Sequence, residues 1–586
     1  MTKNPANSAF VYVPGNYDIP KQGVVGRQSA TAGFLKGFLR HSGVGEYWCY
    51  AHAAEDFEHF RRFVAASDVP PAPIRCISPL GMSGLAGVGA LYRPGPDIGD
   101  YAWLRRHFDQ RAFSLIGVTH TVADHAAMDA IGRLLVAPVQ PWDALVCSSA
   151  AVKAVVEELL DGWAEYLGRR FKSKVEPAFR LPVIPFGVDC DAYAKGESYA
   201  EDRGALRKEL GIGEDDVAVL FVGRLTHIDK ANPVPMYLAM EMTARMGAGK
   251  AGRAFHLIQA GQFPGPDTEQ GFKEAAAAFA PTVKHHFIDG SRNETFKNAW
   301  KAADIFISLS DNIQESFGLT PIEAMAAGLA VVVGDWDGYR DTVRDGKEGF
   351  AVPTLAPPPG SGREIAYFHG SAFAGYKVLT AATSQSTAVD VAASADALVR
   401  LAEDPGLRRK MGESGRKRAR QLYDWRAVVA AYQELWAELA EIRATAQETT
   451  PVAPDRPADP LKGDPFALFK GHPTATIGRS DTLALSPVFD PGLLDRLSGS
   501  GIAVPLASVL LGGDDLAAVI KSLEAGPKTM GELLETVGEQ KRTQMSLSAG
   551  WLAKMGLVVV EGGGPGGDLP APGFASSETW KMLSKT

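Results

Sequence analysis

Two glutamates, Glu315 and Glu323, stand with seven residues between them, around a short polar loop. A helix is expected to start in this loop, with Thr320 as its cap, Pro321 in its first turn and Glu323 at the acidic position of a capping box. The N-terminus of a helix offers unpaired N–H groups and a positive dipole end, so it favours an anion such as phosphate. We therefore expect the two acids to contact two parts of one ligand. Taken singly, Glu323 could be only a capping residue and Glu315 only a solvated loop acid.

Two basic residues follow another apolar run, VAVLFV, at the tip of a predicted strand. Gly223-Arg224-Leu225 comes directly after the run, and Lys230 lies six residues beyond Arg224. Open α/β sheets bind ligands at the carboxyl ends of their parallel strands. We expect Arg224 and Lys230 to face an anionic ligand there. The alternative is a pair of exposed basic side chains, which is the commonest environment of Arg and Lys.

The elements that must position these residues follow the rhythm of a parallel sheet. Apolar runs at 305–309 and 329–333 flank the polar loop and its helix, and Gly328 is a helix stop. Near the N-terminus, the apolar run 10–13 leads into a loop with Gly23 and Gly26, and a helical spacing follows. Strand, glycine loop and helix in this order are typical of a Rossmann-like half. The sequence therefore predicts an α/β fold.

The spacing of Glu315 and Glu323, with Phe317, Gly318 and the following AMAAG, resembles the donor-site signature of glycosyltransferase family four, the retaining GT-B glycosyltransferases of group 1. The segment LPVIPFGVD resembles the turn between the two lobes of that family. Tyr423-Asp424-Trp425 resembles the start of its final crossing helix. The resemblance implies a GT-B architecture, in which two Rossmann-like lobes face a cleft.

The resemblance also implies the roles of individual residues. Glu315 would hold a sugar hydroxyl and favour a positive ring in the transition state, and His120 would contact the donor sugar, although a lone histidine at a strand end is usually structural. These two are the predicted catalytic residues. The predicted donor-binding residues are Arg224, Lys230, Phe317, Gly318, Leu319, Glu323 and Gly26. A glycine in a turn can be explained without a ligand, so the donor-binding role of Gly26 rests on the family resemblance alone.

The predicted reaction moves a sugar, with retention of configuration, from a nucleotide-diphosphate sugar to an unidentified carbohydrate, lipid or protein acceptor. Synthesis of a polysaccharide, glycolipid or glycoprotein is the expected setting. The alternatives are a nucleotide-sugar epimerase of the same fold and a non-catalytic nucleotide-sugar sensor. No cofactor is expected. No metal is expected either, because Arg224 and Lys230, with the amides at the helix start, could replace a divalent ion at the diphosphate. The adjacent His285 and His286 point to opposite faces of a strand and cannot chelate one metal together. Asp335-Trp336-Asp337 matches a D-x-D metal motif only superficially.

The 586 residues are too many for one core. We predict an N-terminal lobe on the acceptor side at 1–197 and a donor lobe at 198–445, whose last helices cross back. A Pro- and acid-rich linker at 446–465 and a small, mainly helical, winged-helix-like module at 466–586 follow. The Gly-rich stretch 81–99 is predicted to be a mobile loop, and 353–390 an insertion of open role.

Composition limits the partners. A net charge of -8 argues against a general nucleic-acid binder. The four cysteines have no C-x-x-C spacing, and no segment offers the roughly 20 apolar residues of a membrane span. The predicted location is the cytoplasm, with any membrane contact peripheral at the inner face. Because the C-terminal module carries slightly more acid than base, we expect it to bind a protein partner or to oligomerise.

Overall fold

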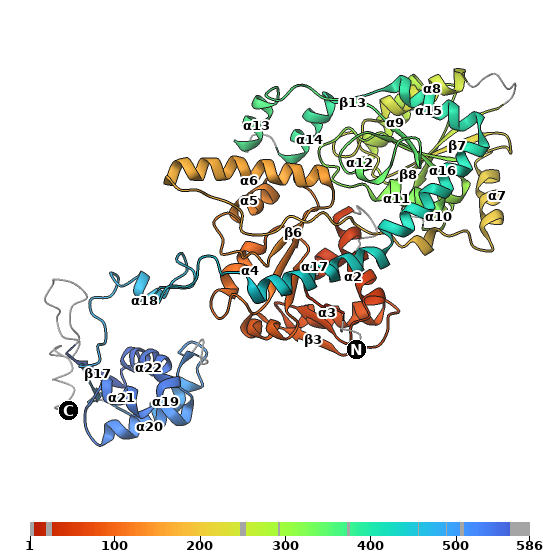
Figure 1. Cartoon of the computed structure of the whole chain (residues 1–586). Helices are drawn as coiled ribbons and strands as arrows, with labels where there is room; N and C mark the ends of the chain where they lie inside the picture. The colour runs from red at the N-terminus through yellow and green to blue at the C-terminus, as the bar shows by residue number, and fades with distance from the viewer. Residues whose placement is uncertain are drawn as a thin grey trace. The chain divides into compact units, whose positions relative to one another are not determined.

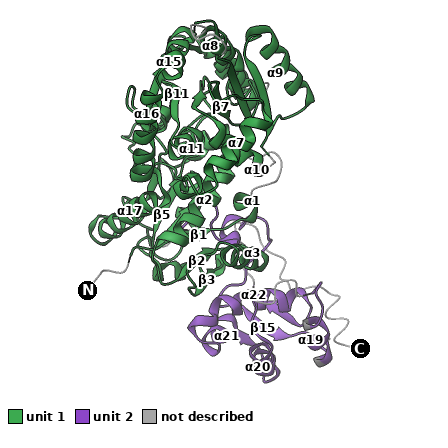
Figure 2. Cartoon of the chain, turned by 90° about the vertical axis from the view of Figure 1, so that its right-hand side faces the viewer, with its two compact units in different colours: residues 1–454 green, residues 455–586 purple. Residues whose placement is uncertain are grey.

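The computed structural model describes residues 5–18, 26–246, 253–290, 293–371, 375–454, 456–487, 489–503 and 509–562. The chain forms two compact units, 1–454 and 455–586 (Figure 2). The first unit contains two parallel six-stranded sheets. Among the described residues, no helix has both the length and the apolar character needed to cross a bilayer.

The first sheet lies in the N-terminal lobe and has the strand order β3-β2-β1-β4-β5-β6. All of its pairings are parallel. This is the Rossmann order 3-2-1-4-5-6, whose reversal between β1 and β4 opens a crevice at the strand tips. The strands are β1 (Ala9–Val11), β2 (Tyr47–Tyr50), β3 (Ile74–Ile77), β4 (Ala90–Arg93), β5 (Ser114–Val118) and β6 (Ala144–Val146). The helices are α1 (Pro14–Tyr17), α2 (Gly26–His41), α3 (Ala54–Ala65), α4 (Ile98–Arg105), α5 (His125–Arg133) and α6 (Ala150–Phe171).

The second sheet repeats the same order, read as β9-β8-β7-β10-β11-β12, again with parallel pairings throughout. Its strands are β7 (Val217–Val222), β8 (Phe255–Gly261), β9 (Lys284–Asp289), β10 (Ile305–Ser308), β11 (Ala330–Gly334) and β12 (Gly349–Val352). The main helices of this lobe are α7 (Tyr199–Glu209), α8 (Pro233–Met246), α9 (Pro266–Phe279), α10 (Asn293–Ala302), α11 (Leu319–Ala327), α12 (Tyr339–Thr342), α15 (Val391–Glu403) and α16 (Pro405–Arg418). Two Rossmann-like lobes facing a common cleft confirm the predicted GT-B fold.

The prediction of a mobile loop at 81–99 is wrong. A 3₁₀ segment at Pro79–Gly87 is followed by β4, which lies next to β1 inside the first sheet. Leu91 and Tyr92 are buried there. The strand is only four residues long and lies between Gly89 and Pro94, so its apolar signal was too short to stand out against the surrounding Gly and Pro residues.

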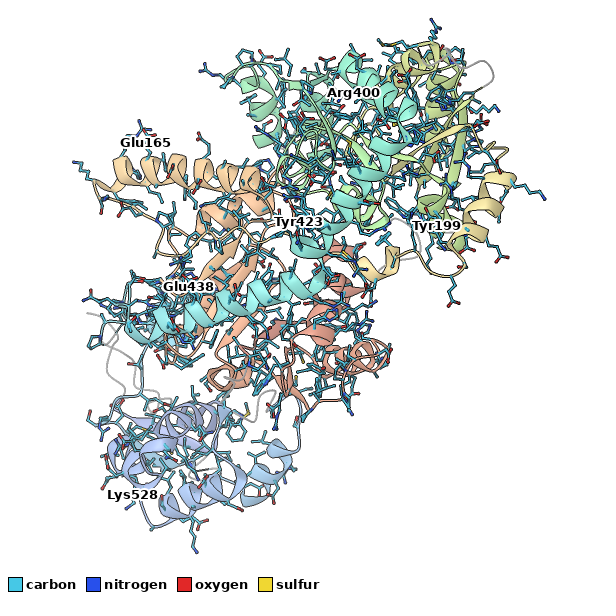
Figure 3. The ribbon with its side chains drawn as sticks, turned by 45° about the vertical axis from the view of Figure 1, so that its right-hand side comes forward. Glu165, Tyr199, Arg400, Tyr423, Glu438 and Lys528 are labelled. Carbon is cyan, nitrogen blue, oxygen red and sulfur yellow. The ribbon has the colours of Figure 1, made fainter. Side chains whose placement is uncertain are left out.

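The chain crosses back to the first lobe through α17 (Trp425–Thr445), as predicted. Figure 3 shows Tyr423 where this crossing begins and Glu438 farther along the helix, over the first lobe. At the crossing point, Val188 N–H donates to the Tyr423 carbonyl at 2.8 Å and Trp425 N–H donates to the Val188 carbonyl at 3.2 Å. The two chain segments that connect the lobes are therefore hydrogen-bonded to each other.

The Trp425 indole packs directly against glycine backbone. A Cβ built on Gly187 would lie 2.4 Å from the indole ring, whereas one on Gly196 meets nothing within 4 Å. Gly187→Ala should therefore destabilise the first unit by about 1–3 kcal/mol, the usual cost of overpacking. The urea midpoint of unfolding measures this, with Gly196→Ala as the matched control. Equal midpoints for the two variants would contradict the packing.

The C-terminal unit contains three antiparallel strands in the order β16-β15-β17, where β15 is Thr482–Leu485, β16 is Lys528–Thr529 and β17 is Val558–Glu561. Its helices include α20 (Gly513–Glu524), α21 (Met530–Thr536) and α22 (Arg542–Lys554). The winged-helix likeness of this module stays a prediction. Residues 446–454 of the predicted linker belong to the first unit, where Thr449 N–H donates to the Gln140 side chain at 2.8 Å.

Candidate functional site

Helix α11 begins beside the cleft, although not as the sequence predicted. Gly318 is the N-cap, with φ of 83°, and no side chain caps the helix. A Cβ on Gly318 would lie 1.9 Å from the Tyr339 ring, so both conformation and space require glycine here. The capping roles expected for Thr320 and Glu323 are therefore wrong, because the helix starts at Leu319 and Glu323 lies beyond its first turn. Gly328 ends the helix in the left-handed conformation, as predicted.

The Thr320 hydroxyl is buried and has no hydrogen-bond partner among the described residues. Removing a true threonine cap costs about 0.5–2 kcal/mol. We therefore expect Thr320→Ala to change the free energy of unfolding by less than about 0.5 kcal/mol, the usual range for a residue without such a role. Since Thr320 lines the cleft, the same variant should weaken nucleoside-diphosphate binding a few-fold, by about one net hydrogen bond. Urea unfolding and titration calorimetry separate the two effects. A loss of more than about 1 kcal/mol in the free energy of unfolding would show that Thr320 does cap the helix.

Glu315 and Lys230 form an ion pair in the cleft. Lys230 Nζ lies 2.5 Å from Glu315 Oε2, and the two side chains are 16% and 12% exposed. The Tyr339 hydroxyl donates to the same oxygen at 3.3 Å. Burial raises the pKa of Glu315, but the charge of Lys230 and hydrogen bonds from Lys230 and Tyr339 outweigh it and hold that pKa below its usual value. Glu315 is therefore ionised at neutral pH.

Arg224 lies at the tip of β7, where the sequence predicted a cation. Its guanidinium donates to Asp229 Oδ2 at 2.8 Å and to Gln314 Oε1 at 3.0 Å. These contacts fix its orientation while its side chain stays 31% exposed. Arg224 and Lys230 therefore both bring positive charge to the wall of the same cleft.

Glu323 accepts a hydrogen bond from Tyr193, which lies in a short 3₁₀ segment between the lobes, Cys190–Tyr193. Burial raises the pKa of Glu323, and the tyrosine hydrogen bond offsets part of that effect. The two glutamates thus differ in environment, because Glu315 has a cation beside it and Glu323 has a phenol. A carboxylate held by one hydroxyl retains acceptor capacity for a ligand.

His120 comes from the first lobe, two residues beyond β5. Its ring stacks on Phe186, with 5.1 Å between ring centroids, and its Nε2 lies 3.5 Å from the Thr31 hydroxyl. Burial and the nearby Arg27 lower the pKa of His120 to about 3, so the imidazole is neutral at physiological pH. Its Nδ1 atom is buried, and no described residue forms a hydrogen bond with it. A neutral ring of this kind can exchange a hydrogen bond with a ligand hydroxyl.

The two lobes meet around these residues. The Ser149 hydroxyl donates to the Ser316 carbonyl at 3.0 Å, and Ser316 Oγ donates to the His120 carbonyl at 2.6 Å. Between the lobes lies a cavity of about 1130 Å³. All nine predicted site residues line it, namely Gly26, His120, Arg224, Lys230, Glu315, Phe317, Gly318, Leu319 and Glu323. The structure brings the residues together, and their individual roles stay predictions.

Sequence reasoning missed several residues of this cavity. Arg27 follows Gly26 directly and Arg133 ends α5, and both line the cavity wall. Tyr339 and Tyr376 also contribute, through the Glu315 hydrogen bond and the cavity wall respectively. The position of Arg27 beside a predicted donor-binding glycine was a usable signal. Arg133 lies at the end of a helix without any motif, so no sequence pattern pointed to it.

Asp335 and Asp337 have separate environments. Asp335 pairs with Arg340 at 3.3 Å, outside the cavity lining. Burial, with a smaller contribution from Glu315, raises the pKa of Asp337 to about 8, and Asp337 hydrogen-bonds with Ser149. Across the described part of the chain, no cluster of three or more His, Cys, Asp or Glu side chains is arranged to hold a metal ion. Metal independence stays a prediction.

Residues 202–357 match the family model described as "Glycosyl transferases group 1". The chain is 31% identical over 262 residues to a D-inositol 3-phosphate glycosyltransferase of Geodermatophilus obscurus, covering 44% of this chain and 54% of the relative. It is 33% identical over 175 residues to the Nocardia farcinica protein of the same name, covering 30% and 36%. The chain thus spans about half the length, or less, of these relatives.

Two solved structures align with the chain at low sequence identity. A glycosyltransferase from Rickettsia africae aligns at 15% identity with a TM-score of 0.49, covering 74% of this chain and 98% of that one. Anabaena HepE, solved in complex with UDP and glucose, aligns at 15% identity with a TM-score of 0.45, covering 73% and 99%.

Proposed function

We infer that the chain, over residues 202–357, is a group 1 glycosyl transferase. From this premise we propose that the protein transfers a sugar from a nucleoside-diphosphate sugar to a hydroxyl of an acceptor, with retention of anomeric configuration. The observation that carries the proposal is the shared cavity, in which Arg224, Lys230, the start of α11 and two glutamates lie together. These groups match the parts of such a donor: an anionic diphosphate, a ribose and a sugar ring.

Arg224, Lys230 and the start of α11 bind the diphosphate. Breaking the anomeric bond adds negative charge to the leaving group. A unit charge pair at 4 Å is worth roughly 4 kcal/mol at an effective dielectric constant of 20. Arg224 and Lys230, aided by the N–H groups at the start of α11, supply this stabilisation without a divalent ion. We therefore propose a metal-independent transfer.

Glu315 binds the sugar and Glu323 binds the ribose. Glu315, ionised beside Lys230, accepts a hydrogen bond from a sugar hydroxyl and favours the positive charge that develops on the ring. Glu323, held by Tyr193, accepts from ribose hydroxyls. His120, neutral and lining the cavity, contacts the sugar from the opposite lobe. In this arrangement the departing phosphate takes the acceptor's proton on the same face of the ring, which gives retention.

The four cysteines are all free thiols. Thiols persist in a reducing compartment, so we extend the proposal to action in the cytoplasm. The relatives are named for D-inositol 3-phosphate, and we take this phosphorylated polyol as the first acceptor to test.

The experiment begins with titration calorimetry of UDP, GDP and ADP, because the three differ chiefly in the base. One of them should bind in the micromolar range. The matching nucleotide-glucose is then incubated with D-inositol 3-phosphate or cell lysate, in the presence of EDTA, and products are read by mass spectrometry and NMR. Transfer with retained configuration supports the proposal. The absence of nucleotide binding at millimolar concentration would contradict it.

The same measurements separate the alternatives. An epimerase would consume the donor and return an isomeric sugar without an acceptor. A non-catalytic sensor would bind the nucleotide sugar and leave it intact. The acceptor-dependent appearance of a new glycoside excludes both.

A further inference from the structure

Residues 356–387, called here the hairpin, form an insertion in the second lobe whose two ends lie next to each other. The short strand β13 (Thr354–Leu355) before it pairs antiparallel with β14 (Ala388–Val389) after it. Between them lie α13 (Arg363–Gly370) and α14 (Tyr376–Gln385). Figure 1 shows these two helices next to α6 of the first lobe. The insertion is thus a folded excursion that starts on one lobe and reaches toward the other.

The hairpin contacts both lobes. On the first lobe, His125 Nε2 lies 3.0 Å from the His369 carbonyl oxygen, and the two imidazole rings stack with 3.7 Å between centroids. The Tyr376 hydroxyl forms a hydrogen bond with Thr121, next to His120. On the second lobe, the Asn312 side chain donates to the carbonyl of the buried Thr380 at 3.5 Å. The hairpin is therefore a second connection between the lobes, separate from α17.

Tyr376 also lines the cavity, near Thr121 and Asp124 of the first lobe and near Arg224 and Asp229 of the second. Most of the groups assigned to the donor, such as Lys230 and Glu323, come from the second lobe, while Gly26 and His120 come from the first. The cavity of about 1130 Å³ is larger than the roughly 300–1,000 Å³ of most small-molecule pockets. It therefore has room for a second substrate beside the donor.

We propose that the hairpin forms one wall of the acceptor site and that Tyr376 contacts the acceptor, which is a small polyhydroxylated compound. Tyrosine suits this role because its ring offers apolar area to the C–H faces of a polyol while its hydroxyl stays hydrogen-bonded. Helix α14 and the contact of its hydroxyl with Thr121 position the ring at the cavity wall. This inference rests on the proposed transfer and adds a specificity-determining residue to it.

The test compares Tyr376→Ala and Tyr376→Phe with Val378→Ala. Val378 lies on the same helix, is 55% exposed and does not line the cavity, so it is a matched control. The probes are D-inositol 3-phosphate, glucose 6-phosphate and glucose, each with the nucleotide-glucose that the unaltered chain binds. Tyr376→Ala should raise the KM of the acceptor at least tenfold and leave the KM of the donor within twofold. Tyr376→Phe, which keeps the ring, should stay within about threefold.

A second readout needs no turnover. Titration of the three probes into the unaltered chain saturated with its nucleoside diphosphate should show binding of at least one, weakened about tenfold in Tyr376→Ala. Binding without turnover would overturn the transfer and leave the role of Tyr376 standing. Equal probe affinities in Tyr376→Ala and Val378→Ala, or a donor KM that rises as much as the acceptor KM, would overturn the inference. So would the absence of binding by all three probes.

Discussion

Glu315→Gln should lower kcat by about 10²- to 10³-fold while nucleoside-diphosphate affinity stays within a few-fold. The change removes a negative charge that faces the developing positive ring, and one preorganised electrostatic group of this kind is worth about that much. Nucleotide binding survives because Lys230, freed from its 2.5 Å contact with Glu315, remains available to the diphosphate. Steady-state kinetics and titration calorimetry measure the two quantities.

The matched control is Asp335→Asn, the same chemical change at an acid of the same lobe that does not line the cavity. It should leave kcat unchanged. Because Glu315→Gln leaves Lys230 without its ionic partner, thermal unfolding of both variants must be followed as well. If Glu315→Gln folds and retains most of its turnover, the role assigned to this acid is wrong.

Lys230→Met should lower kcat/KM by about 10²- to 10³-fold. The size of this decrease follows from the roughly 4 kcal/mol that one unit charge pair contributes. It is smaller than the full amount because Arg224 and the N–H groups at the start of α11 still stabilise the diphosphate. Unlike Glu315→Gln, this variant should lose affinity for the nucleoside diphosphate. It should also move the pH profile. Lys230 helps to hold the pKa of Glu315 below its usual value, so its loss lets that pKa rise and shifts the acid limb of kcat/KM to higher pH.

Two comparisons make this result specific. Lys230→Arg keeps the charge and should recover part of the activity, while Lys273→Met removes an exposed lysine from α9 and should change nothing. An acid limb that stays in place in Lys230→Met would show that Glu315 is not the group that titrates. If Lys230→Met binds the nucleoside diphosphate with unchanged affinity, Lys230 does not contribute to donor binding.

The sequence predicted those parts of the fold that depend on long or regular patterns. The apolar runs around Ile305 and Val331 and the stop at Gly328 predicted the strand, loop, helix and strand of the donor lobe. Sequence reasoning failed at β4, where four residues carried too little periodicity, and at the start of α11. There, Thr320 and Glu323 had the right types for a cap, but the close approach of Tyr339 to Gly318 placed the helix start earlier. That contact joins residues distant in the chain, so it depends on the tertiary fold.

The site was predictable where neighbours in the sequence are also neighbours in space. Glu315, Gly318 and Glu323 belong to one loop and helix, and their spacing carried the signal. Tyr193, Arg133 and Tyr376 come from three distant segments and meet the site only because the lobes face each other. The insertion at 353–390 had a polar and aromatic composition but no motif, and only its contacts with His125 and Thr121 suggest a role.

The backbone hydrogen bonds of Val188 with Tyr423 and Trp425 join the two polypeptide connections between the lobes. At the same point the Trp425 indole packs against glycine backbone. The stacked rings of His125 and His369 form a separate contact between the lobes. A separation of the lobes would have to break this stack together with the hydrogen bonds that link Ser149, Ser316 and His120.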